Sequence, residues 1–323
     1  MRNASLDWLR VISILYITAF WHLFNYTRIW PAYHHPVFWR ITVLALALFV
    51  LISGFLIGSA NTPKTRQELW IFSYKRFIRI YPPYVFALAL FAILELSGRL
   101  TLLKGAFLVG IIFTPPPPTL WFIGMIVIFY ALAPIIMYMS EQVSLLKVTI
   151  FVGLLVAGLV VIRHYTGLFD PRLPLYLPVF VTGVMLARRP QIQLSAATVF
   201  PMFLAAAFSA ALSLNAAGIP DQSLWMLPFA MSSSALIFLL FNGRLRRSIA
   251  IEKLSYASFF LYLLHRPIYH AFVRFFKIED GISRVVMLMF FALPIAVLLA
   301  YIAQHVYDHL VAVFLKRLRL APK

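Results

Sequence analysis

Two histidines occupy positions where membrane-spanning helices would carry them into the bilayer, and a histidine there can act as an acid–base group. His22 follows Arg10 by twelve residues. As a helix, this spacing raises His22 ~18 Å into an apolar layer ~30 Å thick. His265 follows Ser255 by ten residues, which places it ~15 Å deep in another apolar run. The two side chains can therefore face one polar cavity, although each also suits a core histidine bonded to a hydroxyl or a carbonyl.

A neutral histidine is a natural general base for removing a proton from a hydroxyl nucleophile. A carboxylate usually orients such a base, but none of the ten acidic residues lies in the middle of an apolar run. Glu95 is near the outer end of its run, and Asp7 is at the inner edge. A Ser–His–Asp triad is therefore not expected, and Tyr, Ser or backbone groups must orient the base.

Arg76 and Arg79 form a second group that could bind a ligand. They are three residues apart, so they share one face of a helix. The planar guanidinium group suits bidentate binding of phosphate. From the sequence alone, a cationic cluster that holds anionic lipid headgroups and sets the topology is the favoured alternative.

The composition indicates which elements must position these groups. The chain has 323 residues, of which 63% are hydrophobic and only 12% are charged. Soluble domains are about 45–50% apolar and about 25% charged. The net charge of +18 is scattered in short groups between long apolar runs, so nucleic-acid binding is excluded and a multi-pass membrane protein is predicted. The absence of cysteine excludes disulfides and thiolate chemistry.

We predict an all-α bundle of about ten transmembrane helices. The spans are 8–27, 38–59, 81–97, 120–139, 146–163, 174–188, 196–214, 223–241, 255–274 and 284–306. With both termini in the cytoplasm, most of the 28 Lys and Arg residues lie on the cytoplasmic side, including Arg2 and Lys323, as the positive-inside rule requires.

Two segments between these spans are predicted to lie at the membrane surface. Residues 61–80 form a cytoplasmic interfacial helix, because Thr65 and Glu68 make a capping box and Pro82-Pro83 end the helix. Residues 102–118 form a short re-entrant or interfacial piece, because its apolar part is only twelve residues long and four prolines follow it.

Four other histidines are not predicted to be functional. His305 and His309 have the i, i+4 spacing of metal ligands beside Asp308, but they lie at an inner helix end where amphipathic residues belong. No metal is expected. His34-His35 lies in the first outer loop and is expected to be solvated.

Short blocks in a fixed order along the chain resemble the membrane-bound acyltransferase 3 family, of the O-antigen acetylase and exopolysaccharide O-acyltransferase type. The blocks are Leu6-Asp7-Trp8-Leu9-Arg10 before His22, Phe49 to Ser53-Gly54-Phe55-Leu56, Arg76-Phe77-Ile78-Arg79-Ile80-Tyr81-Pro82, Leu120-Trp121-Phe122 through Phe129-Tyr130 and Pro134, and Ser255-Tyr256 through Leu261-Tyr262-Leu263-Leu264-His265 and Pro267. Many members carry a Glu before the Phe-Tyr pair, whereas this chain has no acid between Gly124 and Ile128. It therefore resembles the short branch without that Glu.

The resemblance implies one integral membrane acyltransferase domain over residues 1–323, in the inner (plasma) membrane. It also implies transfer of an acyl group, usually acetyl, from cytosolic acetyl-CoA to a hydroxyl of an extracytoplasmic or lipid-linked sugar. Arg76 and Arg79 would bind the phosphates of coenzyme A, and His22 would be the catalytic base or the group that accepts the acyl. Trp121 and Tyr130 would line the acceptor side, with His265 as a second polar wall. Besides these substrates, the expected partners are membrane lipids.

Other functions remain open at this point. A multi-span transporter or a flippase for lipid-linked sugars explains ten spans and buried histidines equally well. It would, however, favour acids inside the membrane and helices broken in repeated halves, which the sequence lacks. Within the enzymes, the acceptor could be a small hydroxylated molecule and the donor could be succinyl-CoA.

Overall fold

The computed structural model describes residues 3–27, 29, 35–189, 196–212 and 224–317. His34 and the terminal residues Arg2 and Lys323 lie outside the described part, so the predictions made for them are not addressed by it. The helices are α1 (Ala4–Leu15), the π-helix η1 (Tyr16–His22), α2 (Pro36–Gly58), α3 (Arg66–Ile93), α4 (Arg99–Ala106), α5 (Trp121–Gln142), α6 (Leu145–Thr166), α7 (Arg172–Arg188), α8 (Ala196–Leu212), the 3₁₀-helix η4 (Leu224–Met226), α9 (Leu227–Phe241), α10 (Ile249–Phe275), α11 (Ile282–Met287), the π-helix η5 (Leu288–Ala292) and α12 (Leu293–Arg317).

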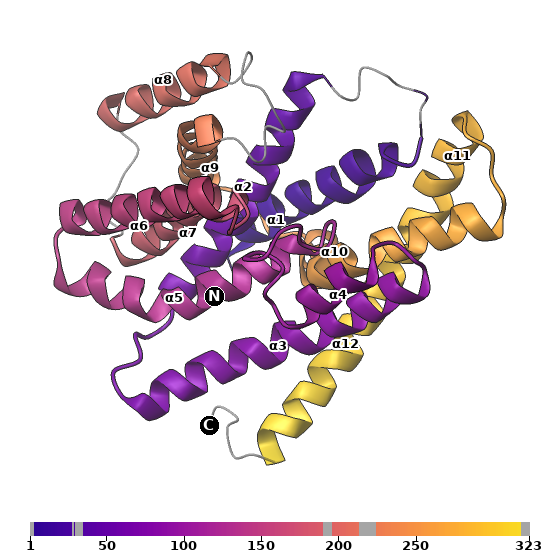
Figure 1. Ribbon diagram of the computed structural model, residues 1–323, viewed down its shortest axis with the longest axis horizontal. Helices are drawn as coiled ribbons and strands as arrows, with labels where there is room; N and C mark the ends of the chain where they lie inside the picture. The colour runs from indigo at the N-terminus through magenta and orange to yellow at the C-terminus, as the bar shows by residue number, and fades with distance from the viewer. Residues whose placement is uncertain (1–2, 28, 30–34, 190–195, 213–223, 318–323) are drawn as a thin grey trace.

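The described residues contain helices and no strands, which confirms the predicted all-α membrane bundle (Figure 1). Where the structure describes them, each of the ten predicted spans falls on one or more helices; residues 213, 214 and 223 of two spans lie outside the described part. Among the described residues, seven helical stretches are long and apolar enough to cross a membrane. The other three predicted spans fall on α7 and α8, which have 17 residues each, and on the more polar α10. The count of ten spans therefore stays a prediction.

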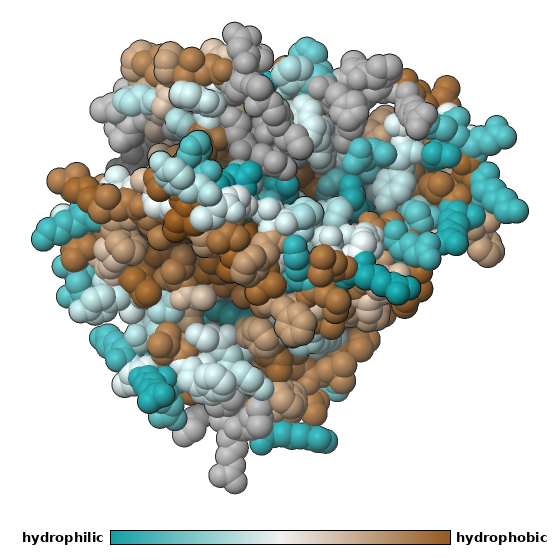
Figure 2. All heavy atoms as spheres, in the orientation of Figure 1, coloured by the Kyte–Doolittle hydropathy of each residue, from teal (hydrophilic) through white to brown (hydrophobic). Residues whose placement is uncertain are grey.

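The surface has the pattern expected of a membrane protein. Figure 2 shows a broad brown area of apolar residues across the middle of the molecule, with hydrophilic residues gathered toward the lower left and the right. Helix α6 has only two buried residues, and Leu146 and Leu154 on it are 68% and 69% exposed. Apolar side chains that face outward along a whole helix are stable when lipid surrounds them.

Helices α2 and α7 approach each other closely at the centre of the bundle. A Cβ atom added to Gly54 would lie 2.1 Å from the carbonyl oxygen of Phe180, and one added to Gly183 would lie 2.1 Å from that of Leu51. Only glycine fits at both positions, as is common where membrane helices pack backbone to backbone. Gly54 belongs to the Ser-Gly-Phe block of the sequence, so this block fixes α2 against α7.

Helix α3 corrects one boundary drawn from the sequence. The capping box of Thr65 and Glu68 is confirmed, but the helix does not end at Pro82-Pro83 and continues to Ile93. Proline at position 82 removes the N–H that would bond the carbonyl of Ile78. The hydroxyl of Tyr307 on α12 donates to that carbonyl instead, so a neighbouring helix supplies the missing donor. Most of the predicted interfacial segment 61–80 and most of the next span, 81–97, therefore belong to one continuous helix, α3.

Residues 102–118 fall on the short helix α4 and the irregular segment after it. Tyr81 and Tyr84 of α3 donate hydrogen bonds to the carbonyls of Ala106 and Gly105, at 2.8 Å and 3.0 Å. These bonds hold the end of α4 against α3. In the sections below, the predicted cytoplasmic side, which carries Asn3, is called the inner side, and the opposite side is called the outer side.

Candidate active site

The structure brings the two predicted histidines into direct contact. Nδ1 of His22 lies 2.7 Å from Nε2 of His265, and the two rings are nearly parallel, with an interplanar angle of 7°. His22 is the last residue of the π-helix η1, and His265 lies on α10. A π-helical segment departs from the 3.6-residue period and is common at functional sites. Both side chains are buried, with exposed fractions of 9% for His22 and 0% for His265.

The hydrogen bonds around this pair fix where the protons are. Nδ1 of His265 lies 3.0 Å from the carbonyl oxygen of Leu261. A carbonyl only accepts, so Nδ1 of His265 carries the proton and Nε2 of a neutral His265 is an acceptor. The contact with His22 then requires that Nδ1 of His22 donates. Nε2 of His22 is left with its lone pair, which is the state a general base needs.

His22 is oriented by its hydrogen bond to His265. The sequence analysis expected Tyr, Ser or backbone groups in place of a carboxylate. The direct partner is a second histidine, and a backbone carbonyl orients that histidine in turn. Among the described residues, neither histidine makes an ion pair with a carboxylate. Tyr269 supports the pair from the other side, since its ring contacts that of His265 and its hydroxyl donates to the carbonyl of Thr18 at 3.1 Å.

A cavity of about 1010 Å³ lies between α1, α2, α3, α5, α10 and α12. Its lining extends from Asn3 and Leu315 at the inner side to Ile17, Phe122 and Tyr262. The fourteen residues from Asn3 to Ile17 correspond to about 20 Å of helix. The cavity is therefore deep enough to lead from the inner surface to the middle of the bundle.

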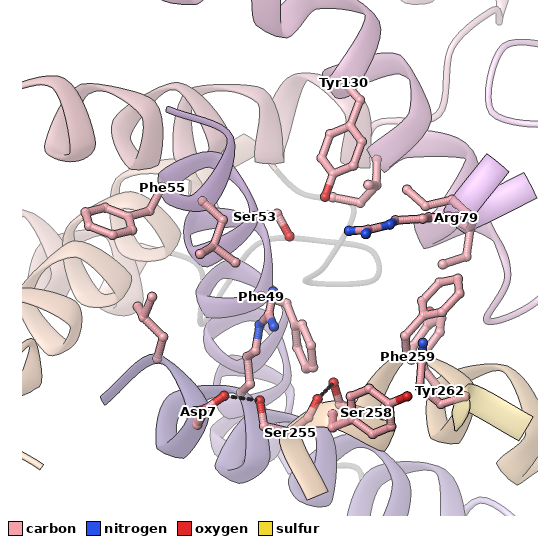
Figure 3. Close-up of a pocket in the computed structure, with 18 of the residues that line it drawn as sticks. Asp7, Phe49, Ser53, Phe55, Arg79, Tyr130, Ser255, Ser258, Phe259 and Tyr262 are labelled. Carbon is pink, nitrogen blue, oxygen red and sulfur yellow. Dashed lines mark hydrogen bonds between the residues drawn. The ribbon is translucent and has the colours of Figure 1, made fainter. Parts of the chain in front are cut away.

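The inner part of the cavity is lined by charged and polar side chains, among them the arginines Arg10 and Arg79. Figure 3 shows the Arg79 side chain pointing into the cavity, with the hydroxyl of Tyr130 directed toward it and toward Ser53. Arg10 also lines this part. Arg76 behaves differently, because its guanidinium carbon lies 3.4 Å from the centre of the Phe72 ring and it donates to the Phe72 carbonyl. Of the predicted arginine pair, only Arg79 lines the cavity, while Arg76 acts on Tyr130 through its charge.

Two carboxylates also line the cavity, and both are bonded to α10. Asp7 accepts a hydrogen bond of 2.6 Å from the hydroxyl of Ser255, and Ser258 donates to the backbone of Ser255 (Figure 3). Asp308 on α12 accepts a hydrogen bond of 2.7 Å from Tyr256. These bonds tie α1 and α12 to α10 and so fix the helix that carries His265.

Tyr262 separates the cavity from the histidine pair. Its ring contacts Phe122 on the cavity side, with centroids 5.5 Å apart, and His265 on the other side, at 6.0 Å. Its hydroxyl donates to the carbonyl of Thr119. Neither His22 nor His265 is among the described residues that line the cavity, whereas Tyr262 both lines it and contacts His265.

Trp121 and Tyr130 lie at different heights along α5. Trp121 is the first residue of α5, and the nine residues to Tyr130 correspond to about 13 Å along the helix. Trp121 is buried near Tyr262 at the outer end, where the guanidinium of Arg172 lies 4.2 Å above its ring. Tyr130 lies beside Arg79 in the cavity lining, whereas Trp121 is not among the described residues that line this cavity.

Sequence reasoning missed Arg10, Tyr262 and Arg266 as site residues. Arg10 falls in the same sequence block as Asp7, at the inner edge of a span, where cations that set the topology are common. Arg266 follows His265 directly inside a predicted span, and an ionisable residue at that depth is itself a functional signal. Tyr262 is part of a quoted block but has nothing in its local sequence that distinguishes it from other membrane tyrosines.

Comparison with known proteins supports the resemblance found in the sequence blocks. A family model described as an acyltransferase domain matches residues 3–301 of the chain. No curated protein and no solved structure matches it. The matched region contains both histidines and all the cavity-lining residues except those on α12, within which it ends. The chain therefore belongs to the membrane-bound acyltransferase 3 family.

Proposed function

We propose that this acyltransferase moves an acyl group, usually acetyl, from cytosolic acyl-CoA to a hydroxyl of an extracytoplasmic or lipid-linked sugar. The observation that carries the proposal is the contact between His22 and His265 near a cavity whose inner part is lined by Arg79 and Arg10. Coenzyme A is rich in phosphate, and its acyl group is at the end of a long thin arm. A deep cavity with arginine at the inner end suits such a donor.

Arg79 is proposed to bind the phosphates of coenzyme A directly, because its guanidinium points into the cavity beside Tyr130. Arg10 lines the same part of the cavity and offers a second guanidinium there. Arg76 packs on Phe72 and is proposed to act through its charge. Tyr130 would contact the donor rather than the acceptor, because it lies at the inner end of the cavity.

His22 is proposed to be the general base. Its Nε2 lone pair takes the proton of the acceptor hydroxyl while the hydroxyl oxygen attacks the thioester carbonyl. The resulting tetrahedral oxyanion collapses, the carbon–sulfur bond breaks, and the coenzyme A thiolate takes the proton from the His22 imidazolium. The products are the O-acylated sugar and free coenzyme A. His265 keeps Nδ1 of His22 protonated, and so keeps Nε2 available for each cycle.

The acceptor is proposed to enter from the outer side, beside Trp121. This residue lies next to Tyr262 and Thr119, at the end of the bundle opposite Asn3 and Leu315. The acyl arm would reach the same point from the cavity after Tyr262 moves aside. Donor and acceptor then approach His22 from opposite sides of the membrane, which fits an enzyme in the inner membrane of the cell.

The test uses membranes that contain the protein, radiolabelled acetyl-CoA and the cell's own surface glycan. The wild type is compared with the variants His22→Ala and Arg76→Ala. We expect labelled glycan with the wild type, almost none with His22→Ala and a reduced yield with Arg76→Ala at low donor concentration. Equal labelling in all three membranes would refute the proposed roles. Transfer from succinyl-CoA alone, or to a small hydroxylated molecule alone, would change the substrate, and solute movement without transfer would favour a transporter.

A further inference from the structure

Arg266 is a cation inside the bundle that the reaction described above does not use. It lies on α10 directly after His265, and its side chain is only partly exposed. Its Nε atom is buried and has no hydrogen-bond partner. Within the described part of the chain, its guanidinium makes no ion pair and no hydrogen bond. A guanidinium that is partly removed from water and has no partner is costly, so a bound anion would stabilise it.

The position of Arg266 relates it to the reacting centre. Its positive charge acts on His22, His265 and Tyr262. Tyr26 donates a hydrogen bond of 3.3 Å to its backbone carbonyl, which ties this turn of α10 to the outer end of the first membrane helix. An anion held by Arg266 would therefore lie on the outer side of the histidine pair, where the acceptor is proposed to enter.

A second arginine approaches the same place from another helix. Arg172 begins α7, and its guanidinium lies above the ring of Trp121 and 3.3 Å from the carboxylate of Asp170. The charge of Arg172, like that of Arg266, acts on Tyr262. Asp170 balances one of these two cations, so the pair of arginines with Asp170 has one positive charge in excess.

Aromatic rings complete this outer region. Trp121 stacks on Tyr176, with centroids 6.3 Å apart, and contacts Phe122, which in turn contacts Tyr262. Aromatic faces offer broad apolar surface beside polar edges. Arginine beside such surface suits a ligand that combines a ring with an anionic substituent.

We propose that Arg266, assisted by Arg172, binds an anionic group of the acceptor, which is a carboxylate or a phosphate on the sugar. This inference rests on the proposed function, because it identifies the substrate of the same site. Bidentate hydrogen bonds from a guanidinium recognise both kinds of anion. Arg266 thus selects acidic sugars over neutral ones and positions the acceptor hydroxyl at His22.

Binding is measured first, because it does not require transfer. The purified protein is placed in phosphatidylcholine nanodiscs, and the affinities of methyl glucoside, methyl glucuronide and glucose 1-phosphate are compared by calorimetry. We expect the wild type to bind one of the two anionic probes about 10- to 100-fold more tightly than the neutral one, as for a charge-assisted hydrogen bond. The probe that binds more tightly identifies the anion as a carboxylate or a phosphate.

The variant Arg266→Gln is expected to lose most of this preference, and Arg266→Lys is expected to keep part of it. The matched control is Arg274→Gln, which removes an exposed arginine eight residues further along α10 and should keep the preference. Thermal unfolding of each variant shows whether it is folded. Equal affinities for all three probes in the wild type, or an unchanged preference in folded Arg266→Gln, would overturn the proposal.

A second set of nanodiscs distinguishes the acceptor from a lipid. Phosphatidylglycerol carries a phosphate anion at high local concentration. If Arg266 binds the sugar's anion, the preference for the anionic probe persists in phosphatidylglycerol. If it is abolished there, a headgroup occupies Arg266 and the proposal is wrong. A preserved binding preference without any acyl transfer would instead contradict the proposed function and leave the anion site standing.

Discussion

Replacing His265 by leucine tests how the second histidine works. Leucine removes the acceptor for the Nδ1–H of His22, which is 2.7 Å from Nε2 of His265 in the wild type, while it keeps an apolar side chain in a fully buried place. His22 would lose the bond that fixes its proton on Nδ1. It would then be free to rotate and to carry its proton on Nε2, where it cannot accept another one.

The expected loss can be estimated from the hydrogen bond. A buried donor without a partner costs about 1–3 kcal/mol, which corresponds to a factor of about 5 to 150. General base catalysis as a whole contributes roughly 10²–10⁴-fold, so this loss is a part of it. We therefore expect kcat to fall by a factor of about 5 to 150 and KM for both substrates to change by less than about threefold.

The assay measures transfer of label from acetyl-CoA by purified protein at several concentrations of donor and acceptor. The variant His265→Gln should recover most of the lost rate, because its amide oxygen can accept from His22. His270→Leu is the matched control, since it makes the same change on α10 five residues away. If His265→Leu instead raised KM for the acceptor and left kcat unchanged, His265 would be a wall of the binding site, and the reasoning on proton positions would be wrong.

Two further predictions concern the donor and the bundle. Arg79→Gln should weaken coenzyme A binding about 10- to 100-fold in a direct binding assay, as for the loss of a charge-assisted bond, whereas Arg66→Gln at the exposed start of α3 should leave it unchanged. Equal affinities in the two variants would remove Arg79 from the donor site. Gly183→Ala should destabilise the protein by about 1–3 kcal/mol in thermal unfolding, because its Cβ would collide with α2. Gly158→Ala on lipid-facing α6 is the control and should not destabilise it in this way, because the added Cβ contacts no neighbouring atom. Identical melting temperatures for both glycine variants would contradict the close packing of α2 and α7.

The pairing of the histidines shows how far sequence reasoning reaches in this fold. Counting the helical rise from polar residues at the inner edge places His22 and His265 at comparable depths, and the structure puts them in contact. Depth follows from the fixed rise of a helix. The direction in which His22 points from its helix cannot be predicted by counting residues, because Tyr16–His22 is a π-helix whose period differs from that of an α-helix.

The continuous helix α3 illustrates the opposite case. Two adjacent prolines are a strong signal for a helix end in a soluble protein. Here the carbonyl that Pro82 leaves without a donor receives one from Tyr307, which is more than 200 residues away in the chain. Such a partner is visible only in the packed bundle, so no local pattern could have predicted that α3 continues.

The candidate site also has features that the sequence predicts and features that only the packing of the helices determines. The types of its residues, histidine at depth and arginine at the inner edge, could be predicted from hydropathy and charge. Which arginine faces the cavity could not, because Arg76 and Arg79 share a helix face in sequence and differ only in what they pack against. The same holds for Tyr130, whose place beside Arg79 depends on how α5 packs against α3.

The central claim is that coenzyme A is bound in the inner cavity while His22, beyond Tyr262, performs the chemistry. The most direct measurement determines coenzyme A affinity and the rate of label transfer on the same preparation of His22→Ala. The account predicts an affinity within about threefold of the wild type and transfer at least about 100-fold slower, as for the loss of a general base. Transfer at close to the wild-type rate by this variant would contradict the account.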